Sequence, residues 1–127
     1  MVVDERAVIE ALRQADARFA FVHGSRAEGS PARPDSDLDV GAWWAGSPPA
    51  AWEVPLPAYV DLVVLNDAPL WLAGRIAQYG VLLFDDDPPA RVRWQADTRL
   101  QYLDEIPYIR ERYRQRRERL AGGVNDG

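Results

Sequence analysis

The feature that most constrains the fold is an apolar run that stops at a glycine–serine pair and is followed by a run that carries spaced aspartates. Residues 19–22 are all apolar, which is typical of a buried strand, and Gly24-Ser25 predicts a turn directly after it. Residues 38–44 indicate a second strand, and Asp37 and Asp39 lie two positions apart at its start. Because residues two apart on a strand share a face, the pattern predicts two carboxylates side by side on one face of a sheet.

The turn and the aspartates suggest an anion site next to a metal site. Glycine allows close approach of the backbone to an anion, a serine hydroxyl donates a hydrogen bond, and the start of a following helix adds partial positive charge. Aspartate oxygens are ligands that Mg²⁺ prefers. A later apolar run, residues 59–65, contains Asp61, a carboxylate that would need a nearby cation to offset its desolvation. These residues predict a phosphate-binding turn beside a divalent cation.

This combination resembles the minimal nucleotidyltransferases, small relatives of the DNA polymerase β-like superfamily. The family motif is a Gly-Ser turn, a glycine, Ser-Asp-x-Asp and a third aspartate on a later strand. Its residues here, with one residue more than the usual spacing before the first aspartate, are Gly24, Ser25, Gly29, Ser36, Asp37, Asp39 and Asp61. The resemblance covers roughly residues 5–107. It implies an α/β (α+β) nucleotidyltransferase fold, with a mixed sheet of about four strands, flanking helices and a C-terminal helical segment.

The resemblance also implies a reaction and its residues. AMP would pass from ATP to a hydroxyl with the help of two Mg²⁺ ions. The expected catalytic and metal-binding residues are Asp37, Asp39 and Asp61. The expected phosphate-binding residues are Gly24, Ser25, Arg26 and Ser36, although a solvated Arg26 is equally compatible with the sequence. His23, the only histidine, is more typical of a strand-end residue beside such a site than of an acid or base.

The partner is also implied by the resemblance. Many stand-alone minimal nucleotidyltransferases are antitoxins that transfer AMP to a tyrosine of a cognate HEPN-type ribonuclease toxin. A chain of 127 residues has little room for an acceptor-binding domain, which fits an acceptor supplied by a partner protein. Two alternatives stay open: a small-molecule nucleotidyltransferase of the aminoglycoside-modifying type, and an antitoxin that acts by binding alone. A homo- or hetero-oligomer is compatible with each of them.

Composition narrows the remaining function classes. The chain has no cysteine, which excludes disulfides, zinc thiolate sites and thiol nucleophiles, and no lysine, which excludes a Walker A P-loop. Residues 1–87 hold six arginines against fourteen acidic residues, which argues against direct nucleic-acid binding. No apolar run approaches the roughly 18 residues of a membrane span, and the N-terminus does not resemble a signal peptide. We expect a cytoplasmic protein with one domain over residues 1–121 and a flexible tail over 122–127.

Hydrophobic periodicity predicts the remaining elements. The predicted helices cover residues 4–17, about 69–79, and 88 to about 120 with a break or kink near Pro107. The predicted strands cover residues 18–23, 37–45, 59–66 and 81–84, with a proline-rich loop over 46–57. Trp71 and Trp94 are expected in the core. The arginine-rich residues 110–119 fit either a solvated helix face or a partner-binding surface.

Overall fold

A computed structural model describes residues 3–24 and 38–125, with side chains described over the same ranges except residues 109 and 121–125. The elements, in chain order, are α1 (Glu5–Gln14), β1 (Phe19–His23), β2 (Leu38–Trp43), the 3-10 turn η1 (Ala51–Glu53), β3 (Val60–Val64), α2 (Leu70–Tyr79), β4 (Val81–Asp85) and α3 (Pro88–Asn125). The predicted helices and strands are confirmed, most of them with somewhat shorter bounds. The predicted loop over 46–57 contains only the short η1 turn.

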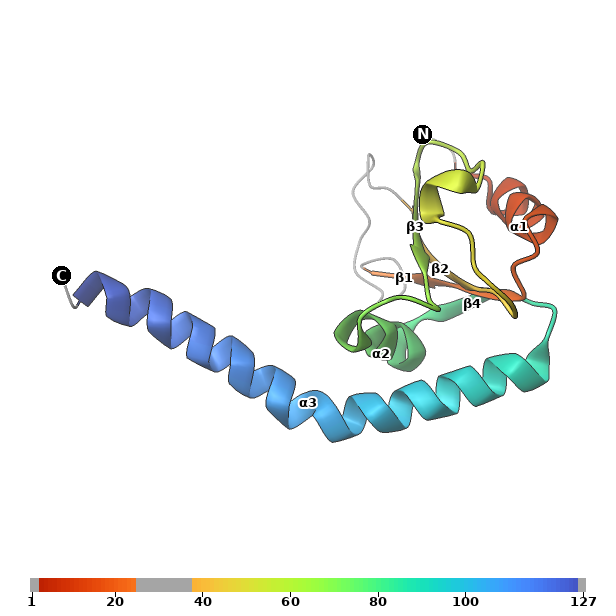
Figure 1. The fold of residues 1–127 in the computed structure, drawn as a ribbon. Helices are drawn as coiled ribbons and strands as arrows, with labels where there is room; N and C mark the ends of the chain where they lie inside the picture. The colour runs from red at the N-terminus through yellow and green to blue at the C-terminus, as the bar shows by residue number, and fades with distance from the viewer. Residues whose placement is uncertain (1–2, 25–37, 126–127) are drawn as a thin grey trace.

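The four strands form one mixed sheet in the order β3-β2-β1-β4 (Figure 1). Strand β1 is antiparallel to both β2 and β4, whereas β2 and β3 are parallel. The end of β1 therefore lies beside the starts of β2 and β4, and the start of β3 lies next to that of β2. This arrangement brings His23, Asp39 and Asp61 to the same end of the sheet.

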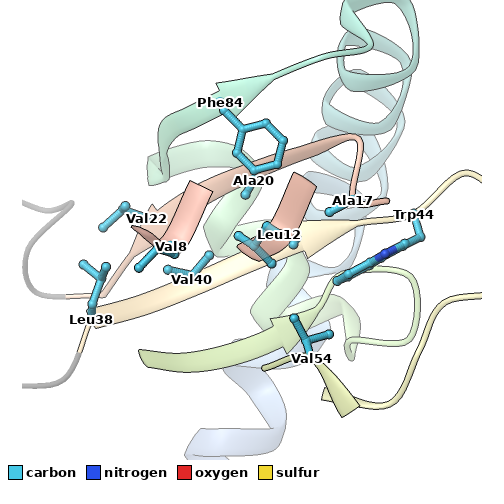
Figure 2. Close-up of a cluster of buried hydrophobic side chains, with 11 residues drawn as sticks. Val8, Leu12, Ala17, Ala20, Val22, Leu38, Val40, Trp44, Val54 and Phe84 are labelled. Atoms are coloured by element: carbon cyan, nitrogen blue, oxygen red, sulfur yellow. The ribbon is translucent and has the colours of Figure 1, made fainter. Parts of the chain in front are cut away.

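Helix α1 covers one face of the sheet. Asp4 caps it by accepting a hydrogen bond from the Ala7 backbone N–H at 3.2 Å. Val8 and Leu12, one helical turn apart, are fully buried against the strands. Burial of such an aliphatic side chain contributes about 1.5–3 kcal/mol. Figure 2 shows the cluster that they join, whose other members are Ala17, Ala20, Val22, Leu38, Val40, Ala42, Trp44, Val54 and Phe84.

Helices α2 and α3 cover the opposite face, around a smaller cluster of Phe19, Phe21, Leu65 and Ile76. Trp94 of α3 packs over both phenylalanine rings, with ring centroids 5.8 and 5.7 Å away, so its predicted place at the core is confirmed. The prediction for Trp71 is wrong, because this side chain is 46% exposed. The expectation rested on the apolar character of tryptophan, whereas the Trp71 side chain lines two surface cavities.

Helix α3 runs from Pro88 to Asn125 with Pro107 inside it, and Figure 1 shows that it changes direction about midway. Of the break or kink predicted near Pro107, α3 shows a bend rather than a break, and the helix continues past its predicted end near residue 120. Proline lacks an N–H and crowds the preceding turn, which a long exposed helix accommodates by bending. The second half of α3 projects away from the sheet (Figure 1). Across the described ranges, no helix combines the length and apolar character needed to cross a membrane.

Candidate functional site

Three polar side chains form a row across three neighbouring strands at one end of the sheet. Asp39 of β2 pairs in register with His23 of β1 on one side and with Asp61 of β3 on the other. Leu38 and Val40 point into the α1 cluster, so strand alternation turns Asp39 to the face that α2 covers. Because adjacent strands lie about 4.8 Å apart, the row places two carboxylates close together.

Gly24 connects this row to the turn that follows β1. Its φ of +79° lies in the left-handed region, which residues with a side chain rarely adopt. A Cβ atom at Gly24 would stand 2.7 Å from the Asp39 carboxylate oxygen Oδ2. Both the backbone angle and the close approach therefore require glycine, and the turn backbone lies directly against Asp39. The phosphate-binding role of Gly24 stays a prediction.

His23 adds little positive charge to the row. Its ring is partly buried, and burial lowers the pKa of His23 more than the neighbouring carboxylates of Asp39 and Asp61 raise it. Its Nε2 atom is buried and has no hydrogen-bond partner in the part of the chain that is described. A neutral imidazole adds no positive charge beside the two carboxylates, whose oxygen atoms are donors that suit a divalent cation.

The described residues contribute only part of the predicted cation site. Among them, no group of three or more histidine, cysteine, aspartate or glutamate side chains could hold a metal ion. Asp39 and Asp61 supply two carboxylates, of which Asp61 is the exposed one. The other predicted site residues lie outside the described residues: Ser25, Arg26, Ser36 and Asp37. The structure therefore places Gly24, Asp39 and Asp61 together, and the full set of site residues stays a prediction.

A cavity of about 180 Å³ lies between the Gly24 turn and α2. It is lined by His23, Gly24, Trp71, Leu72, Arg75, Ile76, Tyr79 and Gly80. Arg75 is the only arginine among these lining residues, and Tyr79 is an exposed aromatic. Three residues of this cavity were not predicted from the sequence as site residues: Trp71, Arg75 and Tyr79. Their spacing of four along a predicted helix is the signal that could have grouped them on one face.

The fold of this chain matches that of several solved structures. No protein-family model and no curated protein matches the chain. Among solved structures, a toxin–antitoxin crystallised with AMP-PNP matches with a TM-score of 0.63 and 24% identity, over 86% of this chain and 98% of that one. A mutant of the MntA–HpeT toxin–antitoxin matches with a TM-score of 0.68 and 20% identity, over the same shares of 86% and 98%.

A third match is a Shewanella oneidensis complex of a tri-AMPylated HEPN toxin with its MNT antitoxin. It has a TM-score of 0.57 and 21% identity, over 84% of this chain and 93% of that one. At such identities the likeness establishes the fold, and the observed mixed sheet with flanking helices agrees with it. The chain thus has the fold of the MNT antitoxins, the nucleotidyltransferase-type chains of HEPN/MNT toxin–antitoxin complexes.

Proposed function

We propose that this protein is a Mg²⁺-dependent nucleotidyltransferase that transfers AMP from ATP to a tyrosine of a cognate HEPN-type toxin, and so acts as a cytoplasmic antitoxin. The observation that carries this proposal is the row of Asp39 and Asp61 in register, with the Gly24 turn against Asp39. Two solved structures of the same fold support it: one is a toxin–antitoxin with AMP-PNP, and the other contains a tri-AMPylated toxin.

The carboxylates would hold the metal. Asp39 and Asp61, together with Asp37 from the sequence motif, provide the oxygen ligands that suit Mg²⁺. When bound, Mg²⁺ polarises the α-phosphate and makes the acceptor hydroxyl more acidic. The acceptor oxygen attacks the α-phosphorus, the bond to the pyrophosphate oxygen breaks, and AMP becomes esterified to the acceptor. Asp61, the exposed carboxylate, takes up the hydroxyl proton, and no covalent enzyme intermediate is needed.

The proposed phosphate-binding residues lie in the turn after β1, in the sequence motif and on α2. The main chain of Gly24, with Ser25, Arg26 and Ser36 of the motif, would bind the β- and γ-phosphates. Arg75 lines the cavity that Gly24 also lines, so we propose it as an additional residue that binds the leaving pyrophosphate. A guanidinium matches phosphate with two parallel hydrogen bonds. Arg75 would thus supply the positive charge that a lysine supplies in many phosphate sites, since this chain has no lysine.

The test is to incubate the purified protein with the product of its neighbouring gene and MgATP, and to map peptides by mass spectrometry. The expected mark is one or more added AMP groups on a tyrosine peptide of the partner. An Asp39→Asn variant, prepared in the same way, should leave the partner unmarked. AMP on a small hydroxylated compound instead would favour the aminoglycoside-type alternative. Neutralisation of the partner without any AMP would favour an antitoxin that acts by binding alone.

A further inference from the structure

The projecting part of α3 differs in charge from the rest of the molecule. This segment, residues 108–120, is called the arm here, and it carries six arginines against two glutamates. Residues 1–87 carry six arginines against fourteen acidic residues. The arm is therefore a basic helix attached to an acidic protein. Such a separation of charge favours an acidic partner for the arm.

The first half of α3 holds the arm in a defined place relative to α2. The Gln95 side-chain amide and the Arg99 Nε each donate a hydrogen bond to the Ala77 carbonyl oxygen, at 3.1 and 2.9 Å. Tyr102 packs directly on Gly74, where a Cβ atom would collide with its ring. These contacts tie α3 to α2 over two helical turns. The arm consequently starts beside α2, which lies between the sheet and α3 (Figure 1).

A cleft of about 210 Å³ separates the arm from the start of α2, and it is lined by Trp71, Arg112, Tyr113 and Arg116. Trp71 also lines the cavity beside His23 and Gly24. Trp71 and Tyr113 are 46% and 55% exposed, although both are large aromatic residues. One surface therefore runs from the candidate active site, over Trp71, to the arm. Exposed aromatic side chains beside arginines are typical of protein interfaces.

The arginines of this cleft are not neutralised from within the described structure. Arg114, on another face of the arm, forms ion pairs with Glu111 and Glu118. In contrast, neither Arg112 nor Arg116 has an ion-pair or hydrogen-bond partner among the residues that the structure describes. Their guanidinium groups can therefore bind carboxylates of another molecule without first breaking an internal ion pair.

We propose that the Trp71 cleft docks an acidic segment of the acceptor protein, and that this contact delivers the acceptor hydroxyl to the catalytic end of the sheet. The delivery of a hydroxyl for AMP transfer rests on the proposed function. The docking of the acidic segment does not, because binding requires no catalysis. The shared Trp71 favours the acceptor over a second copy of this chain. A short segment seated in the cleft would lie next to the cavity beside His23 and Gly24, because Trp71 lines both, and a folded second copy has no such reason to place a hydroxyl there.

The test compares two double variants of the full-length protein with the same change in net charge. Arg112→Glu with Arg116→Glu reverses the charge of the cleft, and Arg110→Glu with Arg117→Glu reverses two arginines of the same helix that do not line it. The probe is the purified product of the neighbouring gene, titrated by calorimetry at two salt concentrations. The cleft variant should bind at least about tenfold more weakly and lose most of its salt dependence. The control variant should bind within about twofold of wild type.

Further measurements separate docking from catalysis. The cleft variant should keep the wild-type circular dichroism spectrum and MgATP affinity, because Arg112 and Arg116 lie outside the proposed catalytic residues. Asp39→Asn should keep the docking affinity while losing AMP transfer. Three results would overturn the docking proposal: equal weakening in both double variants, no binding of the probe to the wild type, or a dimer that the cleft variant alone dissociates. If docking holds but the wild type transfers no AMP, the proposed function fails and the docking surface stands.

Discussion

The two ends of the sheet differ in how their polar groups are satisfied. At the end where β2 finishes, the Trp44 indole N–H donates to the Ala15 carbonyl oxygen at 2.8 Å, and the Asn66 side chain bonds both backbone groups of Trp44 at 3.0 and 2.7 Å. The Arg13 guanidinium also binds the Asp86 carboxylate through two hydrogen bonds of 2.9 Å. Each of these groups has a partner that stabilises the fold.

At the opposite end, the same sheet carries groups that cost stability. Gly24 adopts a left-handed backbone angle, His23 has a buried Nε2 without a partner among the described residues, and Asp39 and Asp61 are adjacent like charges. Backbone strain and adjacent like charges persist where the surrounding fold holds them and where a ligand benefits from them. One end of the sheet maintains the fold, whereas the other end carries the residues of the proposed binding site.

The largest effect is expected for Asp39→Asn. Loss of a metal-binding carboxylate should lower the rate of AMP transfer by about a thousandfold, equivalent to about 4 kcal/mol of transition-state stabilisation. The melting temperature should stay near the wild-type value, because asparagine has nearly the same shape as aspartate and the side chain is only partly buried. Rate assays and thermal melts of the same sample check both halves. A large drop in melting temperature would mean that Asp39 belongs to the stabilising part of the fold.

Gly24→Val should impair both binding and folding. The new side chain would meet the Asp39 carboxylate, since a Cβ atom alone stands 2.7 Å from Oδ2, and a φ of +79° disfavours a β-branched residue. We expect a loss of about 2–3 kcal/mol in the free energy of unfolding, together with weaker MgATP binding. Gly46→Val is the matched control, because a Cβ atom at Gly46 meets nothing within 4 Å. Similar losses in the two variants would disprove the special role of Gly24.

Trp44→Phe tests the end of the sheet at which the polar groups have hydrogen-bond partners. The variant keeps a buried aromatic ring but leaves the Ala15 carbonyl oxygen without its indole donor. The free energy of unfolding should fall by about 1–2 kcal/mol in a denaturant titration. The rate of AMP transfer, measured well below the melting temperature, should remain near wild type. A specific loss of activity without a loss of stability would contradict the division between the two ends.

The smallest effect is expected for Asp86→Asn, which breaks an exposed ion pair. The Arg13 guanidinium lowers the pKa of the Asp86 carboxyl in the folded protein. The ion pair therefore stabilises the fold above the unfolded pKa of about 3.9, and this contribution disappears as the pH falls through the lower folded value. Melts of both proteins should differ slightly at neutral pH and converge in acid. A difference that persists in acid would rule out the ion pair as its cause.

Sequence patterns predicted the secondary-structure elements correctly, because hydrophobic periodicity is a local signal. The motif also predicted that Asp39 and Asp61 belong to one site; their strands pair in register, and the shared site stays a prediction. Prediction from the sequence was weaker for features that depend on helix packing. Arg75 and Tyr79 become cavity residues only because α2 crosses the sheet beside Gly24, and periodicity does not encode that crossing. Trp71 was misplaced for the same reason, since an apolar residue on a helix does not reveal which neighbour covers it.

The most direct test of the account is the rate of AMP transfer by an Asp61→Asn variant, measured by the intact mass of the partner protein over time. Asp61 and Asp39 lie on different strands that pair in register. If the two carboxylates form one catalytic site, removal of the Asp61 carboxylate must slow AMP transfer. We expect at least a hundredfold slower gain of AMP mass, equivalent to about 2.7 kcal/mol of transition-state stabilisation, with an unchanged melting temperature. A partner that gains AMP at the wild-type rate with Asp61→Asn would contradict it.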